Sequence, residues 1–398
     1  MRAYATNSAG TAYGAAVSFT TLVGLPVVST KAVTEITKIS AVSGGTISYN
    51  GGGTVTECGL VYATSENPTI ANNKITASAS VTDWVTNLSS LTLNTNYHVR
   101  AYATNSAGTA YGEDISFTTL ADITKFWVVG DYNSWSNTDN ASYIISTPTS
   151  NGLAEGYVYL TGSAFKLTTD HSWDNAHTFG DDGSGNLTNP GGDIPVPADG
   201  YYRIRANLND MTYSLVKTDW GVIGDATPNG WDDETALTYN ATSKTWQGAM
   251  ALTAALIKFR ANHLWDYNYG SDAADGTLGA GQANIALTEA SDYSIELDLS
   301  VPNEYKYQIN RWGLIGDATG SWDTDQNMAW SASKQAFTVT LNLTAAKIKF
   351  RANDDWPVNY GGDLNALTLG GADIAISEAG NYTVTFNPWT LKATVTKN

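Results

Sequence analysis

Short apolar or alternating runs, separated by polar turns, fill residues 23–121 of the chain. A strand directs successive side chains to opposite faces, so runs of this kind predict β-strands, and their recurrence about every 8–12 residues predicts a β-sandwich. Tyr97 stands just before one of these runs, where its hydroxyl can bond back to the preceding loop as a tyrosine corner. We therefore expect an immunoglobulin-like sandwich that acts as a spacer.

The segment 257–262 shows the alternation most clearly. Its apolar positions are expected to face a core, and the opposite face then carries Lys258, Arg260 and Asn262. Trp265 and Tyr267 follow in a polar stretch that we expect to be a loop. A flat aromatic ring beside donors of fixed geometry suits a neutral sugar ring, although a face with lysine and arginine can also be no more than a solvated face.

This segment belongs to a long repeat. The pattern W-G-x-I-G-D-A-T, followed by K-F-R-A-N-x-x-W-x-x-N-Y-G, occurs at 220–270 and at 312–361, and a blurred copy begins at 126. The tryptophans near the start of the copies are Trp127, Trp220 and Trp312, spaced by 93 and 92 residues. A unit of that length can close its own core, so it predicts a domain repeat and not a solenoid, and the three tryptophans are expected in those cores.

A second repeat marks the N-terminal region, because residues 2–14 recur identically at 100–112. The chain is therefore expected to open on the last strands of a truncated domain, and Met1 is not expected to be a natural start. A signal peptide or lipidation cysteine would lie outside such a fragment. The expected fold class is all-β with tandem sandwich domains. Their boundaries are 1–22 (truncated domain), 23–121 (spacer), 122–218 (module 1), 219–310 (module 2) and 311–398 (module 3).

Composition argues against some classes of binding partner. The chain has 38 acidic and 21 basic residues and a net charge of −17, which argues against nucleic acid or anionic lipid. No apolar run reaches 18 residues, so no hydrophobic segment predicts a membrane span. Cys58, the single cysteine, lies in a strand-like run and is expected to be a buried, inert thiol.

At the motifs W-G-x-I-G-D-A-T and K-F-R-A-N-x-x-W-x-x-N-Y-G, the chain resembles the outer-membrane starch-binding lipoproteins SusE and SusF of Bacteroidetes. The resemblance covers residues 125–398. Residues 23–121 resemble a fibronectin type III domain of the kind found in Bacteroidetes surface proteins. The resemblance implies that each module is a small carbohydrate-binding β-sandwich whose site pairs two aromatic planes with lysine or arginine donors. Carried over by motif, the carbohydrate-binding residues are Trp231, Lys258, Arg260, Asn262, Trp265 and Tyr267 in module 2, Trp322, Lys349, Arg351, Asn353 and Trp356 in module 3, and Trp135, Lys166 and Trp173 in module 1.

The three copies are not equal. Val358 stands where module 2 has Tyr267, and module 1 has Thr168 and Asp170 where module 2 has Arg260 and Asn262. We therefore expect the weakest binding from module 1. The turn tryptophans of each copy can also fold onto a sandwich edge.

Other chemistry is weakly indicated. The loop 181–186 lacks the closing glutamate of a calcium loop, and His171 and His177 have no further cysteine or histidine nearby to complete a zinc site. The acidic residues fall in turns of small domains, which leave little room for a glycosidase cleft. We expect no enzyme, no metal and no cofactor.

The sequence thus predicts a non-catalytic, extracellular cell-surface protein that captures an α-glucan such as starch. In the full-length protein a lipid anchor would attach it to the outer membrane, beside a SusC/SusD-like uptake complex. Two alternatives stay open: a structural or adhesive surface protein, and the accessory binding region of a larger glycan-degrading enzyme.

Overall fold

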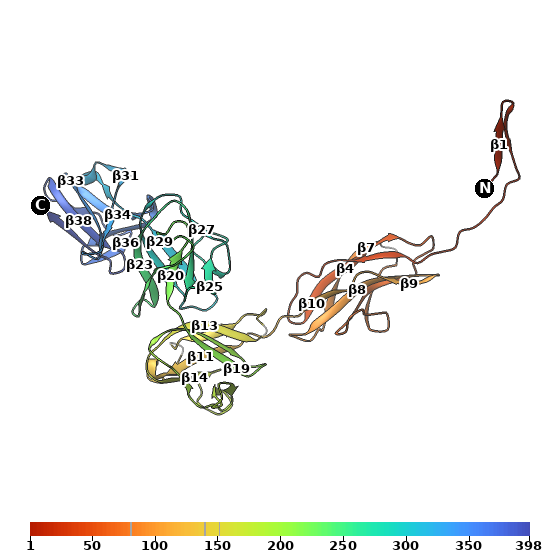
Figure 1. Cartoon of the computed structure of the whole chain (residues 1–398), viewed down its shortest axis with the longest axis horizontal. Helices are drawn as coiled ribbons and strands as arrows, with labels where there is room; N and C mark the ends of the chain where they lie inside the picture. Colours follow the sequence, from red (N-terminus) through yellow and green to blue (C-terminus); the bar gives the residue numbers. More distant parts are fainter. Residues whose placement is uncertain (80–81, 139–140, 151) are drawn as a thin grey trace. The chain divides into compact units, whose positions relative to one another are not determined.

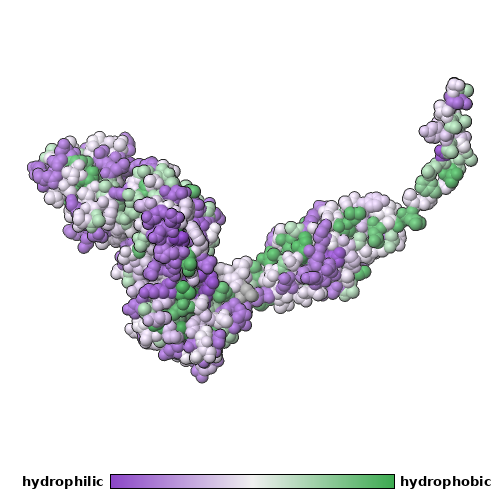
Figure 2. Space-filling model, viewed as in Figure 1, coloured by the Kyte–Doolittle hydropathy of each residue, from purple (hydrophilic) through white to green (hydrophobic). Residues whose placement is uncertain are grey.

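The computed structural model describes residues 1–79, 82–138, 141–150 and 152–398 (Figure 1). These residues form antiparallel sheets with two short 3-10 turns and no α-helix, which confirms the predicted all-β class. They fall into two compact units, one made of 1–123 with 146–152 and the other of 124–145 with 153–398. On the face drawn in Figure 2, hydrophilic and hydrophobic residues are interspersed.

The first unit holds a hairpin and a sandwich. The hairpin, β1 (Tyr4–Asn7) and β2 (Gly10–Tyr13), is exposed along its whole length. One sheet of the sandwich is β3 (Val27–Thr30), β4 (Ser40–Tyr49) and β7 (Asp83–Ser89). The other is β5 (Glu57–Ala63), β6 (Asn73–Ala77), β8 (Asn96–Asn105), β9 (Gly108–Tyr111) and β10 (Ile115–Thr118).

Apolar side chains from both of these sheets meet in one core. Cys58 is buried in it, as expected. The backbone N–H of Thr92 donates to the Tyr97 hydroxyl at 3.1 Å, which confirms the predicted tyrosine corner.

The second unit contains the three modules. In module 1 a nine-stranded sheet follows the order β16-β15-β14-β11-β12-β13-β18-β19, with β17 paired to β14. Its strands are β11 (Lys125–Gly130), β12 (Tyr143–Ser146), β13 (Leu153–Leu160), β14 (Ala164–Thr168), β15 (Thr178–Asp181), β16 (Leu187–Thr188), β17 (Ile194–Pro195), β18 (Gly200–Asn207) and β19 (Thr212–Lys217). The 3-10 turn η1 (Asp131–Asn133) follows β11.

Module 2 has two sheets. The larger has the order β21-β20-β24-β25-β26 with β27 paired to β24, and the smaller has the order β22-β23-β28-β29. The strands are β20 (Trp220–Ile223), β21 (Thr235–Ala236), β22 (Thr238–Asn240), β23 (Thr245–Leu252), β24 (Leu256–Ala261), β25 (Leu264–Gly270), β26 (Gly279–Ala280), β27 (Ile285–Ala286), β28 (Ser291–Asp298) and β29 (Lys306–Asn310).

Module 3 repeats this topology, with sheets β31-β30-β34-β35-β36 (β37 paired to β34) and β32-β33-β38-β39. The strands are β30 (Trp312–Gly316), β31 (Ser321–Asn327), β32 (Ala329–Ser331), β33 (Ala336–Leu343), β34 (Lys347–Ala352), β35 (Asp355–Asp363), β36 (Ala366–Leu369), β37 (Ile374–Ala375), β38 (Gly380–Asn387) and β39 (Lys392–Lys397), with η2 (Asp317–Thr319) after β30.

The tryptophans that open the copies differ in burial. Trp220 and Trp312 are buried in the cores of modules 2 and 3, as expected. Trp127 is half-buried, so the expectation that it is a core residue is wrong. Its ring contacts both the Lys125 ammonium, 4.5 Å from the ring centroid, and the His171 ring.

Modules 1 and 2 share an aromatic cluster within the second unit. Tyr157 and Tyr201 of module 1 are buried together with Trp220 and Tyr269 of module 2. The Tyr157 and Tyr269 hydroxyls are 3.2 Å apart. Because the two modules bury apolar surface against each other, an isolated module would expose part of this cluster to water.

Candidate functional site

A matching pair of tryptophans, brought together from two separate segments, recurs in each module. The ring centroids of Trp231 and Trp265 lie 6.1 Å apart at an interplanar angle of 36°. Trp322 and Trp356 repeat this arrangement at 6.1 Å and 35°. In module 1, Trp135 and Trp173 lie at 6.2 Å and 48°. All six tryptophans were named from the sequence, and the structure brings them together in three matching pairs.

The first tryptophan of each pair is positioned by the loop that follows the opening strand. In module 2 this loop leaves β20 at Gly224, which has φ 139°, and a Cβ there would lie 2.2 Å from the Leu256 carbonyl oxygen. The Thr227 hydroxyl donates to the Gly224 carbonyl oxygen at 2.9 Å and ties the loop closed before Trp231. Gly316 and Thr319 make the same contacts in module 3. The G-D-A-T motif is therefore a loop-closing device.

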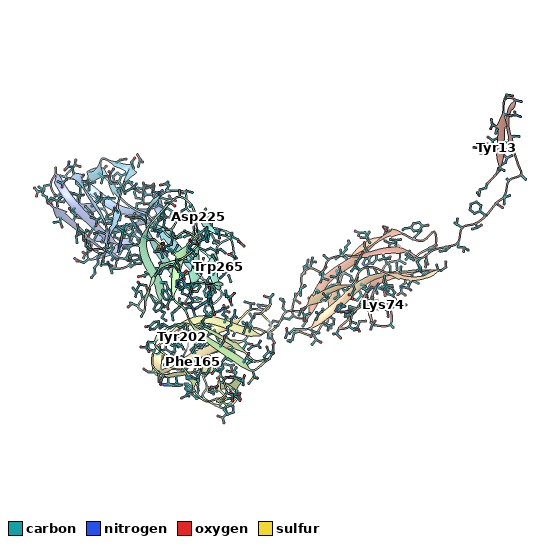
Figure 3. All side chains as sticks on the ribbon, viewed as in Figure 1. Tyr13, Lys74, Phe165, Tyr202, Asp225 and Trp265 are labelled. Atoms are coloured by element: carbon teal, nitrogen blue, oxygen red, sulfur yellow. The ribbon has the colours of Figure 1, made fainter. Side chains whose placement is uncertain are left out.

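The second tryptophan follows a tight turn. Asn262 and His263 both have φ 56°, as a two-residue type I′ turn requires, and they join β24 to β25. Trp265 therefore lies at the start of a strand and not in a loop (Figure 3). Its side chain is 49 % exposed, and that of Trp356, at the start of β35, is 42 % exposed.

A bulge aims this exposed indole. Ala261 pairs with Leu264, but Arg260 already pairs with Asn268, so residues 265–267 leave the ladder. The Asn268 side chain closes the bulge by donating to the Trp265 carbonyl oxygen at 2.5 Å. In module 3, Asn359 donates to the Trp356 carbonyl oxygen at 2.7 Å, across the same register shift. Bulges of this kind redirect a side chain out of the sheet.

In modules 2 and 3 an arginine lies against the exposed indole. The guanidinium carbon of Arg260 is 5.0 Å from the Trp265 ring centroid, and that of Arg351 is 4.8 Å from the Trp356 centroid. Both distances fall within the range of a cation–π contact. Each arginine thus supports the inner face of a tryptophan whose outer face meets solvent.

These arginines are buried and paired, so the expectation that they lie on an exposed strand face is wrong. Arg260 is 4 % exposed and Arg351 is 3 % exposed. Arg260 forms an ion pair with Glu234 and also donates to the Asp232 carbonyl oxygen at 3.3 Å. A charge taken out of water needs a partner, and Glu234 and the Asp232 carbonyl oxygen here accept from Nε and Nη2 of Arg260. Both arginines act on the site through the tryptophans that they carry.

The buried acids were missed from the sequence. Arg351 donates to both carboxylate oxygens of Asp325 at 3.1 Å, and Asp325 matches Glu234 in position. Gly221 and Gly313 make room for these acids, because a Cβ on Gly313 would lie 2.5 Å from the Asp325 Cβ. The signal was present: in both copies an acid stands 26 residues before the arginine and three residues after the tryptophan.

Lys258 and Lys349 are closer than the arginines to the expected role of hydrogen-bond donors. The Lys258 ammonium donates to the Asn268 side chain at 3.0 Å, and Lys349 donates to Asn359 at 2.9 Å. An ammonium has three N–H donors, so each of these contacts uses one of them. Lys258 is 9 % exposed, and burial lowers the pKa of its ammonium, whereas Lys349 is half-buried. Each lysine thus joins the bulge that carries the exposed tryptophan.

Asn262 and Asn353 serve the module junctions, not the exposed face where the sequence placed them. The Asn262 side chain accepts from the Asp219 N–H at 2.9 Å and donates to the Lys217 carbonyl oxygen at 2.8 Å. The Asn353 side chain accepts from the Arg311 N–H at 3.0 Å. Their positive φ turns the side chain toward the incoming linker, and the alternation of the strand ends one residue earlier.

Tyr267 also leaves the pair. Its ring lies 5.1 Å from the Arg203 guanidinium of β18 and packs against the aromatic cluster shared by modules 1 and 2. Val358, at the matching position of module 3, packs against its own module core.

Module 1 keeps the tryptophan pair on a different support. The buried Thr168 donates to the Asn137 side chain at 3.1 Å, so a neutral pair replaces the arginine and its acid. The Trp135 indole N–H donates to the Asp131 carboxylate at 2.9 Å. Lys166 donates to the Gly191 carbonyl oxygen and lies 3.2 Å from Asp193. Trp173 is 46 % exposed, so its outer face is still open.

The acid beneath the module 3 pair has unusual electrostatics. Burial raises the pKa of Asp325 to about 6; Arg351 opposes this rise, whereas the neighbouring Asp354 adds to it. Burial acts on Asp354 in the same direction, but its contact with Arg311 at 2.5 Å, together with Asp325 and Arg351, outweighs burial and lowers its pKa. Asp325 therefore changes its protonation near pH 6.

Metal-ligating chemistry is limited to one cluster within the described residues. Asp233, Glu234 and His263 offer ligand atoms within 4.8 Å of one another. Glu234 is already paired with Arg260, and His263 Nδ1 lies 2.7 Å from Asp233, so the groups satisfy one another. In the loop 181–186, the Asp182 carboxylate accepts backbone N–H groups of the same loop. His177 contacts Asp174 at 2.7 Å, which raises the pKa of its imidazole.

No protein-family model and no curated protein matches the chain. Across the described part of the chain, no helix has both the length and the apolar character to cross a membrane.

Proposed function

We propose that this protein binds a neutral glycan, without catalysis, at its tandem tryptophan pairs. The observation that carries the proposal is the repetition of one pair geometry in three modules, with ring centroids 6.1–6.2 Å apart. A core contact would bury both rings, but one tryptophan of each pair stays 42–49 % exposed.

The chemistry of the pair supports a sugar ligand. A pyranose ring presents apolar C–H faces, which stack on an indole, and hydroxyls at its rim, which need hydrogen-bonding groups. No partner within the described residues takes the indole N–H groups of Trp265 and Trp356, so both can donate to a ligand. Stacking that buries about 100 Å² at about 25 cal/mol/Å² contributes about 2.5 kcal/mol per ring.

The preorganised position of Trp265 also supports the proposal of a sugar ligand. The cation–π contact with Arg260 and the bulge closed by Asn268 hold Trp265 before a ligand arrives. A held side chain loses little conformational entropy on binding, which favours affinity. After association costs, two rings and a few hydrogen bonds give roughly millimolar to tens of micromolar affinity per site.

We infer an α-glucan of the starch type as the ligand. The two planes of each pair are tilted by 35–48°, and tilted planes suit a curved chain better than a flat one. The motif resemblance to starch-binding SusE and SusF lipoproteins points the same way. On this proposal the protein acts at the cell surface as a lipid-anchored protein and supplies glycan to a SusC/SusD-like uptake complex.

Tandem sites would act together on one polymer. Once one module holds the chain, the next site meets it at an effective concentration that a free chain cannot reach. Trp265→Ala is therefore expected to weaken retention on insoluble starch modestly, and Trp265→Ala with Trp356→Ala to nearly abolish it. Tyr49→Ala, at an aromatic residue of the spacer that is 57 % exposed, is the matched control and should change nothing.

Two outcomes would contradict the proposal. Equal loss in the single and double variants would exclude tandem action, and full retention in the double variant would exclude the pairs as the site. Binding should also fall less than about tenfold between about 50 and 500 mM NaCl, because stacking and neutral hydrogen bonds are weakly screened.

A further inference from the structure

A cleft of about 620 Å³ lies where modules 2 and 3 meet, apart from the tryptophan pairs. Its aromatic walls are Tyr239 of β22, Trp330 of β32 and Trp389, which follows β38. None of the residues that the repeat motifs singled out lines it. The tryptophan pairs described above therefore do not account for this cleft.

The walls are held in place by contacts between the two modules. The Trp330 backbone N–H donates to the Asp292 carboxylate at 2.8 Å. The buried Trp312 indole N–H donates to the Ser294 hydroxyl, also at 2.8 Å. Because these bonds cross the junction, the cleft is a built feature of the second unit.

The cleft is neutral throughout. All of its lining residues are uncharged, in a chain whose net charge is −17. A site for a phosphate, a carboxylate or a cation would place at least one opposite charge in its wall. The polar side-chain groups are instead the amides of Asn240, Gln247 and Gln335 and the hydroxyls of Thr238 and Tyr239.

The aromatic groups are arranged to meet a ligand that is partly apolar and partly polar. Trp330 and Trp389 meet edge to face, with centroids 5.6 Å apart at 75°, and both are half-buried. Neither indole N–H has a partner within the described residues. The Gln335 amide nitrogen donates to the Ala332 carbonyl oxygen at 2.7 Å, which leaves its side-chain oxygen to accept. Aromatic planes with indole donors and an amide acceptor match a sugar ring.

A second cavity continues from the first. It has a volume of about 400 Å³, is lined by Tyr132, Tyr159 and the exposed Lys244 among others, and shares Tyr239 and Ala241 with the cleft. The Lys244 ammonium is its one charged group, and an ammonium can donate to sugar hydroxyls. Tyr159 and Tyr239 are stacked, with centroids 4.8 Å apart at 11°. Two cavities that meet at one tyrosine suit an extended ligand better than a single small molecule.

We propose that the cleft at the junction of modules 2 and 3 is a further binding site for a neutral oligosaccharide, whose chain continues over Tyr239 toward module 1. The proposal rests on the proposed function for the class of ligand, but it does not require the tryptophan pairs. A chain bound here would contact all three modules at once. Surface capture at the pairs would then be joined by a site that reads several consecutive sugars.

The test is fluorine NMR of the whole chain labelled with 5-fluorotryptophan, with signals assigned by single Trp→Phe variants. The probes are maltoheptaose, cellohexaose and laminarihexaose, which are neutral chains of different linkage. The Trp330 and Trp389 signals report the cleft, and those of Trp265 and Trp356 report the pairs. We expect the cleft signals to shift saturably with at least one probe, and to do so also in the variant Trp173→Ala/Trp265→Ala/Trp356→Ala.

In that triple variant, Trp389→Ala is expected to weaken the remaining affinity at least tenfold, and Trp389→Phe, which keeps a stacking plane, less than threefold. If Trp389→Ala does not fold, Gln335→Ala replaces it, with an expected loss of at least threefold. Cleft signals that stay fixed while the pair signals shift would overturn this inference and leave the proposed function standing. Shifts confined to the cleft would support the inference and count against the pairs, and no shift with any probe would overturn both.

Discussion

Replacing Glu234 by glutamine removes the carboxylate that balances Arg260 beneath Trp265. The side chains of this pair are 5 % and 7 % exposed, so little water can take over. One carboxylate oxygen accepts from Arg260 at 2.9 Å, and the other accepts from the His263 N–H at 2.9 Å. An amide has one oxygen, so its NH₂ group must face one of these two donors. The variant therefore loses a charge pair and gains a donor–donor conflict.

The expected cost follows from the burial of the pair. Removing one partner of a buried ion pair costs about 3–5 kcal/mol, because the other charge is left uncompensated. For a domain of 60–100 residues, each kcal/mol lowers the melting temperature by about 4–8 °C. We therefore expect the module 2 transition of Glu234→Gln to move down by at least about 12 °C.

A matched double variant separates stability from binding. Arg260→Met with Glu234→Leu removes both charges and fills the space, which is often close to neutral for stability. It also removes the cation under Trp265, a contact of about 0.5–2 kcal/mol. Stability should thus return to near that of the wild type, while maltoheptaose affinity of module 2 falls about twofold to thirtyfold.

Scanning calorimetry of the full chain measures the first effect, and isothermal titration in the Trp173→Ala/Trp356→Ala background measures the second. A shift below about 3 °C for Glu234→Gln would mean that Arg260 does not depend on this carboxylate. Unchanged affinity in the stable double variant would mean that the arginine does not support the tryptophan, and the account of the site given above would be wrong.

Three further results are expected. Because the pKa of Asp325 is raised from 3.8 to about 6, the folded state holds the proton of this carboxyl more tightly than the unfolded state does. The stability of the wild type relative to Asp325→Asn should therefore fall as pH rises from about 4 to about 6 and then level off. A difference in denaturation midpoint that does not change with pH would contradict this. Asn262→Ala should lower stability by about 1–3 kcal/mol, because it loses the junction hydrogen bonds and places alanine at a positive φ. Maltoheptaose affinity should stay within about twofold. A large loss of affinity at unchanged stability would instead make Asn262 a ligand contact. With the other two sites removed, module 1 should bind maltoheptaose at least about tenfold more weakly than module 2 by calorimetric titration, because module 1 has the neutral Thr168, bonded to Asn137, where module 2 has the arginine that supports Trp265. Equal affinity would show that the tryptophans alone make the site.

Local periodicity carries much of the fold. Alternation in 257–262 correctly directs Ile257, Phe259 and Ala261 into the core, where all three are fully buried. Turn residues and the long repeat likewise predict an all-β chain, because alternation and turn chemistry are properties of adjacent residues. The tryptophans of the pairs could also be named, since each stands in a repeated motif.

Alternation did not predict that the second face of the strand in 257–262, which carries Arg260, is buried. Alternation tells which side of a strand Arg260 is on, but it does not tell what covers that side. The cover is Glu234 and Trp265, and Glu234 is held there because Gly221 leaves it room. The contact of Glu234 with Arg260 joins positions 26 residues apart, so a strand face that the sequence predicts to be solvated is a buried support.

What the sequence by itself determined is therefore the class of the fold, its repeat, the strands that face inward and the aromatic residues available for a site. Only the tertiary structure decided which donors are consumed, that Asn262 ties a module junction, and that Tyr239, Trp330 and Trp389 share one cleft. The physical reason is that periodicity is a property of adjacent residues, whereas burial, pairing and clefts arise where distant segments meet.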